Sequence, residues 1–342
     1  MIHFSHMTPV RIAINGFGRI GRAFIRRSWD RPEIEIVAVN DLGSLENLAY
    51  LLKYDTVYGR APFSVEAKDG NLIINGKPVR FLSEKDPAAL PWSELDIDVV
   101  IESTGVFDDF EKAQAHVAAG AKRVVISAPA KGDTGGETVL MGVNEEKLKT
   151  CAISSNASCT TNASSPVIAI LDEAIGIDYA ILSTTHAYTA TQSIVDSPVK
   201  GSDLRRGRAA AQNIIPSSTG AAIAVGKAYT SLDGRFDGVS LRVPVPAGSI
   251  ADITFIAKRD TTAEEVNELL RKASKEARWE GIFRASDDPL VSSDIVGEPH
   301  ASIAELSMTR VVGPRLVKVM AWYDNEMGYT ESLVRHALKA AA

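Results

Sequence analysis

The sequence contains two cysteines, and one of them lies in a setting that suits a reactive thiol. Cys159 occupies the centre of SNASCTTN (155–162), where its neighbours are small or hydroxylated. A buried free cysteine usually behaves as a small hydrophobic residue among apolar side chains, so this setting favours an accessible thiol. An apolar helix is expected after the segment, and a helix N-terminus stabilises a thiolate. The pattern predicts Cys159 as a nucleophile and Cys151 as a packing residue.

A nucleophilic thiol needs a proton acceptor, and His186 is the candidate among six histidines. It ends an expected strand in STTHAYTATQ (183–192), again beside hydroxyl side chains. An imidazole can lower the pKa of a thiol by forming an ion pair with the thiolate, and it can then carry the proton of the reacting oxygen. Taken alone, His186 also fits an ordinary surface or core histidine.

A glycine-rich turn near the start of the chain predicts a dinucleotide site. The segment GFGRIG (16–21) has the G-x-G-x-x-G spacing, follows an apolar strand and opens a helix. Gly16 would make the tight turn, Gly18 would let the backbone approach a pyrophosphate, and Gly21 would let helix pack on strand. The helix N-terminus attracts phosphate charge, so we interpret the segment as cofactor-binding rather than as a purely structural turn.

Asp41 supports this interpretation because it ends the second apolar strand, IEIVAVN (34–40), about 20 residues beyond the glycines. A carboxylate there can accept hydrogen bonds from the ribose hydroxyls of NAD, although Asp is also favoured as a helix N-cap. Ser103, Thr104 and Gly105 end a further strand, where the carboxyl edge of the sheet would meet the cofactor. By themselves these three residues also fit a simple turn.

The composition limits the class of protein. The 342 residues carry a formal net charge of -6, which argues against nucleic acid or an anionic membrane as the main partner. No uncharged apolar run reaches the ~18 residues of a membrane span, and two cysteines without a leader segment indicate a reducing, cytoplasmic setting. No cluster with metal-ligand spacing is present. The basic segment KGSDLRRGR (200–208) is either a solvated loop or a segment that holds an anionic ligand.

Alternating strands and helices in the first half predict a parallel sheet covered on both faces. We expect strands at 10–16, 34–40, 96–105 and 121–129, with helices at 18–29 and 109–119. After Cys159 the strands become longer, with expected strands at 179–187, 238–245, 250–258 and 315–323 and helices at 162–176, 261–277 and 328–342. The expected fold class is α/β, with an N-terminal Rossmann-type parallel sheet domain and an α+β catalytic domain on a mostly antiparallel or mixed sheet.

The two candidate sites together restrict the chemistry. A Cys-His pair by itself would also serve a peptidase or an acyltransferase. A dinucleotide site adds a hydride acceptor, so thiolate addition to an aldehyde would give a thiohemiacetal and hydride transfer would give a thioester. A second nucleophile would then release the acyl group.

At this point the sequence resembles phosphorylating glyceraldehyde-3-phosphate dehydrogenases. The resemblance covers nearly the whole chain, and its motifs occur in the order of that family: INGFGRIGR (14–22), SNASCTTN (155–162), HAYTATQ (186–192), DLRRGRAAAQNIIPSSTGAA (203–222), RVPVP (242–246) and WYDNEMGY (322–329). It implies NAD as cofactor, glyceraldehyde 3-phosphate and inorganic phosphate as substrates, and a homotetramer. It also implies a glycolytic or gluconeogenic enzyme that proceeds through a thioester on Cys159.

The resemblance further implies a role for each motif residue. Cys159 would be the nucleophile and His186 the acid-base group. The substrate and phosphate sites would be formed by Ser158, Thr160, Thr189, Arg206, Thr219, Gly220 and Arg242. The cofactor residues would be Gly16, Phe17, Gly18, Arg19, Ile20, Asp41, Lys85, Ser103, Thr104, Gly105, Phe107, Ser127, Asn325 and Tyr329. No metal is implied.

Domain boundaries and rival functions complete the expectations. We expect an NAD-binding domain over 8–157, a catalytic domain over 158–323, and a C-terminal helix over 324–342 that packs back on the NAD-binding domain. Erythrose-4-phosphate dehydrogenase, which shares the thiolate chemistry, is the alternative function. The segment SSTGAA (217–222) argues against this alternative, because it is intact as in the glyceraldehyde enzymes. Ser197 stands where strictly NAD-dependent members usually have leucine, so weak use of NADP is also expected.

Overall fold

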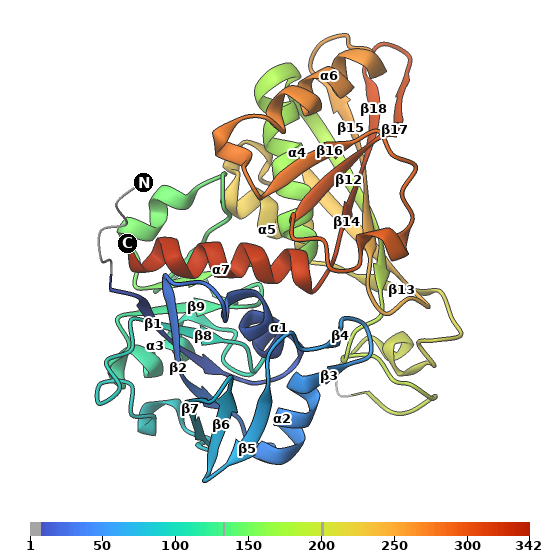
Figure 1. Cartoon of the computed structure of the whole chain (residues 1–342). Helices are drawn as coiled ribbons and strands as arrows, with labels where there is room; N and C mark the ends of the chain where they lie inside the picture. The colour runs from blue at the N-terminus through green and yellow to red at the C-terminus, as the bar shows by residue number, and fades with distance from the viewer. Residues whose placement is uncertain (1–7, 133, 200–201) are drawn as a thin grey trace, which may run out of the picture. The chain divides into compact units, whose positions relative to one another are not determined.

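A computed structural model describes residues 8–132, 134–199 and 202–342 (Figure 1). These residues divide into two compact units that interleave along the sequence. The first contains the described residues up to Val139 together with Glu145–Asn156 and Leu333–Ala342, and the second contains Leu140–Asn144 and Ala157–Ser332. Of the predicted basic segment, Lys200 and Gly201 lie outside the described residues.

The first unit is built on a nine-stranded sheet with the order β10-β11-β9-β8-β1-β2-β7-β6-β5. The strands from β10 to β7 in this order pair in parallel, and β5, β6 and β7 form an antiparallel meander at the edge. The strands are β1 (Val10–Asn15), β2 (Ile34–Asn40), β5 (Val65–Lys68), β6 (Asn71–Ile74), β7 (Lys77–Leu82), β8 (Val99–Glu102), β9 (Arg123–Ile126), β10 (Glu137–Thr138) and β11 (Ile153–Ser155). A separate pair is formed by β3 (Tyr54–Asp55) and β4 (Gly59–Arg60).

Three helices connect these strands, namely α1 (Arg19–Ser28), α2 (Leu45–Lys53) and α3 (Phe110–Ala118). Polar caps fix where two of them begin, because Ser44 and Asp109 accept hydrogen bonds from the first free amides of α2 and α3. Short 3-10 turns occur at η1 (Pro87–Ala89) and η2 (Glu145–Lys149). Strand–helix alternation thus places the carboxyl ends of β1, β2 and β8 side by side.

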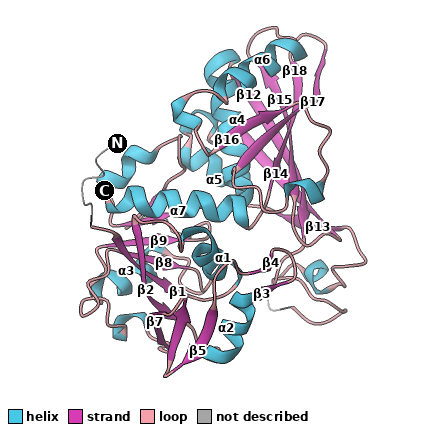
Figure 2. Cartoon of the chain, viewed as in Figure 1, coloured by secondary structure: helices cyan, strands magenta, loops and turns pink. Residues whose placement is uncertain are grey.

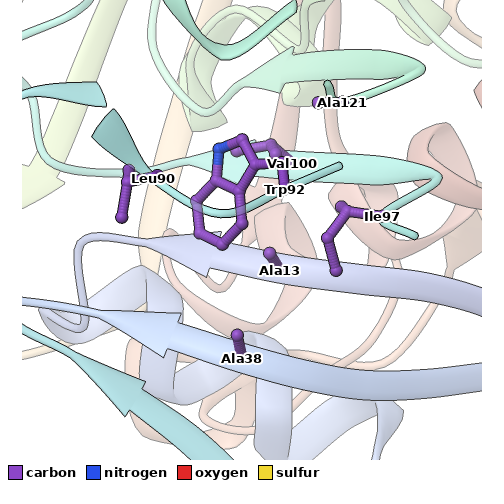
Figure 3. Close-up of a cluster of buried hydrophobic side chains, with 7 residues drawn as sticks. All are labelled: Ala13, Ala38, Leu90, Trp92, Ile97, Val100 and Ala121. Atoms are coloured by element: carbon purple, nitrogen blue, oxygen red, sulfur yellow. The ribbon is translucent and has the colours of Figure 1, made fainter. Parts of the chain in front are cut away.

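Figure 3 shows a buried apolar cluster that packs against this sheet. The indole of Trp92 lies beside the strands, where Ala13 of β1 and Ala38 of β2 present only methyl groups. Leu90, Ile97, Val100 and Ala121 complete the cluster. Small side chains on the two strands therefore leave room for the largest side chain of the cluster, and its burial removes apolar surface from water.

The second unit contains a seven-stranded mixed sheet with the order β13-β14-β12-β15-β18-β17-β16 (Figure 2). Only the pairs β12–β14 and β16–β17 are parallel. The strands are β12 (Ile177–Ala187), β13 (Ile215–Ser218), β14 (Phe236–Val243), β15 (Ser249–Ala257), β16 (Phe283–Ser286), β17 (Ser302–Val312) and β18 (Leu316–Tyr323). The helices α4 (Cys159–Ile175), α5 (Ala221–Ala228) and α6 (Ala263–Ala273) pack on the sheet. Four 3-10 turns are η3 (Leu204–Gly207), η4 (Thr230–Leu232), η5 (Ala277–Trp279) and η6 (Ser292–Ile295).

The last helix, α7 (Met327–Ala341), contributes its final residues to the first unit. There the buried His336 lies between two polar side chains, with Nε2 2.7 Å from Ser154 Oγ and Nδ1 3.0 Å from Asn156 Oδ1. Burial lowers the pKa of His336 to about 3. The imidazole is therefore neutral at pH 7, and one of its nitrogens donates while the other accepts.

The predicted fold class is confirmed, since a parallel Rossmann-type sheet and a second, mixed sheet are both present. Individual boundaries differ from the prediction. The helix expected over 261–277 is the shorter α6, because Thr262 caps it at Glu265 N and the chain turns after Ser274. Among the described residues, no helix is long and apolar enough to cross a membrane.

Candidate active site and cofactor cleft

The nucleophile predicted from the sequence lies at the start of α4. Ser158 is the N-cap, and its hydroxyl oxygen accepts a hydrogen bond from Thr161 N (3.1 Å). Ala157, just before it, is buried and adopts a left-handed backbone conformation with a φ of 52°. Tyr329 donates a hydrogen bond from its hydroxyl to Ala157 O (3.1 Å). The cap and this turn explain why the helix begins three residues earlier than the expected start at Asn162.

Cys159 and His186 are 27 residues apart in the sequence and meet in the second unit. The Sγ atom lies 3.3 Å from His186 Nε2. Nδ1 of His186 lies 2.6 Å from Ala187 O, which only accepts, so we place the proton of the neutral ring on Nδ1; the neighbouring Arg242 Nη1 then donates to Ala187 O (3.3 Å) and not to the ring. Nε2 consequently presents a lone pair to the thiol, as a general base must.

Burial governs the protonation of this pair. It raises the pKa of the Cys159 thiol, an effect that Arg242 and hydrogen bonds from Thr160 oppose. Burial and, as the second largest effect, the positive charge of Arg242 together lower the pKa of His186 to about 3. The ion pair expected from the sequence is thus not the form that this environment favours. A neutral thiol beside a neutral imidazole is favoured instead.

Arg242 reaches the pair because of strand register. The parallel strands β12 and β14 place His186 directly beside Arg242. Its Nη1 atom lies 2.9 Å from His186 Nδ1 and 3.3 Å from Ala187 O. Tyr323 packs its ring edge-on against the imidazole, with centroids 5.9 Å apart, and its buried hydroxyl bonds Thr160 Oγ1 (2.9 Å) and Thr184 Oγ1 (2.8 Å).

Hydroxyl groups and a second guanidinium lie near this centre. Thr189 Oγ1 is 2.9 Å from Thr191 Oγ1, and Arg206 Nη1 donates to Thr191 Oγ1 (3.3 Å). Both Arg206 and Arg242 lower the pKa of His186 through their charge. Neither guanidinium forms an ion pair with any carboxylate in the described part of the chain. An unpaired, partly buried guanidinium is a strong site for a phosphate group.

The remaining predicted phosphate residues lie on two segments of the second unit, at the starts of α4 and α5. Gly220 is the N-cap of α5 and has open space where a Cβ would project. The Thr219 hydroxyl accepts from Ala221 N (3.2 Å). Ser158 and Thr160 use their hydroxyls within the protein, as described above. A cavity of about 610 Å³ is lined by Ala190, Thr191, Gln192, Ser193, Pro198, Val199, Ser202, Asp203, Arg206 and Ser218.

In the first unit, the glycine turn has the geometry that a dinucleotide needs. A Cβ on Gly16, whose φ is +94°, would lie 2.5 Å from Thr104 N, and a Cβ on Gly21 would lie 2.3 Å from Gly16 O. Gly18 has no atom within 4 Å of its Cβ position, so the backbone there is open to a ligand. The three roles predicted for these glycines therefore agree with the close contacts of the turn, and the residues fit a bound NAD.

A cavity of about 390 Å³ adjoins this turn. Its lining includes the predicted residues Gly16, Gly18, Asp41, Lys85, Ser103, Thr104 and Phe107, together with Asn15, Asn40, Leu42, Glu84 and Val106, which the sequence analysis did not single out. Other predicted cofactor residues have different surroundings. Arg19 forms an ion pair with Asp55 (2.8 Å), and Asn325 belongs to the second unit, where its Oδ1 accepts from Ser249 Oγ (3.2 Å).

Further predicted cofactor residues do not line the 390 Å³ cavity, and some of them form hydrogen bonds through their backbone. Phe17 N donates to Asp41 Oδ2 (2.7 Å), and Ile20 lies in the first turn of α1. Gly105, with a φ of 70°, turns the chain between Thr104 and Val106. Ser127 N donates to Glu102 O (2.9 Å) at the end of β9. Tyr329 is buried in the second unit.

Asp41 is held rigidly at the cavity. Its Oδ2 accepts from Phe17 N and its Oδ1 accepts from Gly43 N (2.8 Å). The alternative interpretation of Asp41 as a helix N-cap is wrong, because Ser44 caps α2 by accepting from Asn47 N (3.3 Å). The carboxylate therefore stays available to the cavity through its remaining lone pairs.

Coenzyme preference should follow from this carboxylate. The 2′-phosphate of NADP would add about two negative charges beside Asp41, whereas the ribose hydroxyls of NAD can donate to it. We expect kcat/KM to favour NAD by at least about tenfold, or ~1.4 kcal/mol. Asp41→Ala should bring the kcat/KM values for the two coenzymes closer together, mainly because NAD binding becomes weaker. Steady-state kinetics with both coenzymes at saturating substrate will measure the ratio, and equal efficiency with NADP in the parent would contradict the prediction.

A dinucleotide cleft in one unit, and in the other a half-buried cysteine against a buried histidine, beside arginines that form no ion pair with a described carboxylate, define a class of protein, the dehydrogenases that use a thiol nucleophile. Comparison with known proteins specifies the family. The NAD-binding domain model of glyceraldehyde 3-phosphate dehydrogenase matches residues 10–110, and the C-terminal domain model of the same family matches residues 158–325. The chain belongs to the glyceraldehyde-3-phosphate dehydrogenase family.

Curated relatives agree with this assignment. The chain is 48% identical over 328 residues to glyceraldehyde-3-phosphate dehydrogenase 2 of Streptomyces arenae, which covers 95% of the chain and 96% of the relative. It is 48% identical over 332 residues to glyceraldehyde-3-phosphate dehydrogenase 1 of Streptomyces avermitilis, covering 96% and 98%. The predictions of the family, of an NAD-dependent oxidoreductase and of NAD as cofactor are confirmed.

Proposed function

We propose that the protein catalyses the NAD-dependent oxidative phosphorylation of D-glyceraldehyde 3-phosphate to 1,3-bisphosphoglycerate. The observation that carries this proposal is the 3.3 Å approach of Cys159 Sγ to His186 Nε2 beside Arg242. It brings a nucleophile, a base and an anion site together. Family membership supports the same chemistry. The proposal includes an NAD-binding domain over 8–157, a catalytic domain over 158–323 and a C-terminal helix over 324–342 that packs back on the NAD-binding domain.

The residues of the second unit supply the acid-base steps. As Sγ adds to the aldehyde carbon, Nε2 of His186 takes the thiol proton and can return it to the oxygen, which gives a thiohemiacetal. NAD supplies the acceptor for the hydride that leaves this carbon. His186 removes the hydroxyl proton in the same step, and the product is a thioester on Cys159. Inorganic phosphate then attacks the carbonyl carbon, the acyl phosphate leaves, and Cys159 regains a proton.

Two anion sites follow from the cationic groups. We assign the substrate phosphate to Arg242, Thr189 and Thr191, and the attacking phosphate to Arg206 with Ser158, Thr160, Thr219 and Gly220. Protonated His186 would face the like charge of Arg242, which lies 2.9 Å from Nδ1. A phosphate bound to Arg242 would offset that repulsion. Substrate binding would thereby raise the pKa of His186 and favour proton transfer from the thiol.

The assignment of Arg242 predicts a difference between substrates. Arg242→Leu should reduce kcat/KM for glyceraldehyde 3-phosphate at least about tenfold more than for unphosphorylated glyceraldehyde, because only the former presents an anion to the guanidinium. Parallel steady-state assays with the two aldehydes measure this ratio. Arg208→Leu is a matched control, since Arg208 pairs with Asp196 on the surface. Equal losses with both aldehydes would count against the substrate-phosphate assignment.

One assay tests the proposed function. NADH formation should be fast with glyceraldehyde 3-phosphate and should require inorganic phosphate for turnover, because phosphate is the deacylating nucleophile. Erythrose 4-phosphate, tested in the same assay, should be used with at least about tenfold lower kcat/KM. Turnover that does not depend on phosphate would overturn the phosphorylating reaction, and a preference for erythrose 4-phosphate would overturn the substrate.

We also propose a homotetramer, which the second sheet supports. Register places Tyr179, Ile256, Leu316 and Val312 in one row across β12, β15, β18 and β17, and each is at least 40% exposed. An apolar row of this kind marks an interaction surface, and a second copy of the chain is its proposed partner. Light scattering on the purified protein should give four times the chain mass. A monomer would contradict the proposal.

Both cysteines are free, which fits the proposed cytoplasmic location.

A further inference from the structure

A buried polar row joins the strand ends that adjoin the cofactor cavity of the first unit. Asn40, Asn15 and Glu102 end the neighbouring strands β2, β1 and β8, and the register pairs Asn15 with both of the others. Each side chain is at most 4% exposed. Asn15 and Asn40 also line the cavity. Polar groups this deeply buried need hydrogen-bond partners, and these residues find them in one another.

The hydrogen bonds of the row all point toward Glu102. Asn40 Nδ2 donates to Asn15 Oδ1 (2.7 Å), and Asn15 Nδ2 donates to Glu102 Oε2 (2.6 Å). Trp92 Nε1 lies 3.0 Å from His116 Nδ1, and because an indole N–H only donates, Nδ1 must be the acceptor. Nε2 therefore carries the ring proton and donates it to Glu102 Oε2 (3.0 Å).

Each end of the row forms hydrogen bonds with residues that line the cavity. Glu102 Oε1 accepts from Thr104 N (2.8 Å) and from the Thr104 hydroxyl, whose oxygen accepts from Val106 N (3.1 Å). At the other end, Asn40 Oδ1 accepts from Glu84 N (2.8 Å) and its Nδ2 donates to Glu84 O (2.9 Å). Thr104, Val106 and Glu84 all line the cavity. The carboxylate of Glu102 thus determines which atom donates and which accepts in each hydrogen bond between the two ends of the row.

We infer that Glu102, supported by His116, is a positioning residue for the adenosine half of NAD. The cavity contains Asp41, the carboxylate placed to bind ribose, so this is where the adenosine half belongs. Both oxygens of Glu102 accept hydrogen bonds, and no lysine or arginine in the described part of the chain pairs with it. An amide at this position would set a donor against a donor, and either Thr104 or the Asn15–His116 side would lose its partner.

The test is the isosteric variant Glu102→Gln, with calorimetric binding of NAD and of ADP-ribose. We expect Kd for both ligands to rise about tenfold, the cost of one lost charge-assisted hydrogen bond. At saturating NAD, kcat should stay within about twofold, because the second unit is unchanged. Ser28→Ala is the control, since it removes a buried hydroxyl bond to Phe24 O in α1 that has no link to the row. Its Kd values should match the parent.

Two substitutions of His116 separate positioning from folding, because His116 is absent from the cavity lining. His116→Gln retains an acceptor for Trp92 and a donor for Glu102, so ADP-ribose affinity should stay within about threefold of the parent. His116→Leu loses both groups, and its Kd should rise at least about fivefold. Unchanged ADP-ribose affinity in folded Glu102→Gln or in His116→Leu would overturn the inference. A parent protein that bound neither ligand would overturn the cofactor assignment of the cavity as well.

Discussion

Cys159→Ser should lose at least about 10³-fold in dehydrogenase kcat, because an alkoxide is far harder to form near neutral pH than a thiolate and the serine cannot form the thioester. NAD binding should be retained, since the cofactor cavity is lined by residues of the first unit. Steady-state kinetics and NAD titration of the same preparation measure both effects.

Cys151→Ser is the matched control for this variant. Cys151 is the other free thiol, and burial raises its pKa as well, with Glu137 adding to the effect. It lies in the first unit, outside the Cys-His pair, and its replacement should leave activity within about twofold. Iodoacetamide labelling with peptide mapping gives an independent test. Preferential modification of Cys151 with retained activity would show that the nucleophile is assigned to the wrong cysteine.

His186→Asn should slow acylation by about 10² to 10⁴, the range associated with a positioned acid-base group. Asparagine can accept a hydrogen bond from the thiol but cannot take its proton. Alkylation of Cys159 at pH 7 should slow for the same reason. Rapid-mixing measurement of the first turnover and iodoacetamide kinetics read the two effects separately.

His300→Asn is the control for the histidine, because it makes the same chemical change in the second unit. His300 bonds Glu298 (2.6 Å) instead of a cysteine. Its replacement should alter neither acylation nor thiol reactivity. If His186→Asn alkylates as fast as the parent, His186 does not activate Cys159, and another group must accept the proton.

Much of the chemistry was predictable because it rests on local patterns. The glycine turn, Asp41 after the second strand and Cys159 at a helix start are each recognisable from neighbouring residues. Their structural requirements are also local, such as the positive φ of Gly16 and the cap at Ser158. A short segment that must turn in one way carries its own signature.

The contacts that complete the site depend on distant pairings and were not predictable in the same way. The pairing of His186 with Arg242 follows from the parallel register of β12 and β14, and Tyr323 packs against the imidazole from β18. Thr191 and Glu102 were missed because an isolated hydroxyl or carboxylate carries no local signal. Strand β17 was also missed. It alternates poorly, with five buried residues in succession from Ser302, so its period does not indicate a half-exposed strand.

The division of the chain has a consequence for the order in which the protein is made. His336 bonds Ser154 across 182 residues, and the segment between them is almost entirely the second unit. A growing chain therefore releases residues 157–332 before residues 333–342, which complete the first unit. Domains generally fold as units while the chain is synthesised at about 5–20 residues per second. Roughly ten seconds or more therefore pass before the last helical turns of the first unit have been made. The early strands of the first unit are synthesised first, yet the sequence of the second unit is complete sooner.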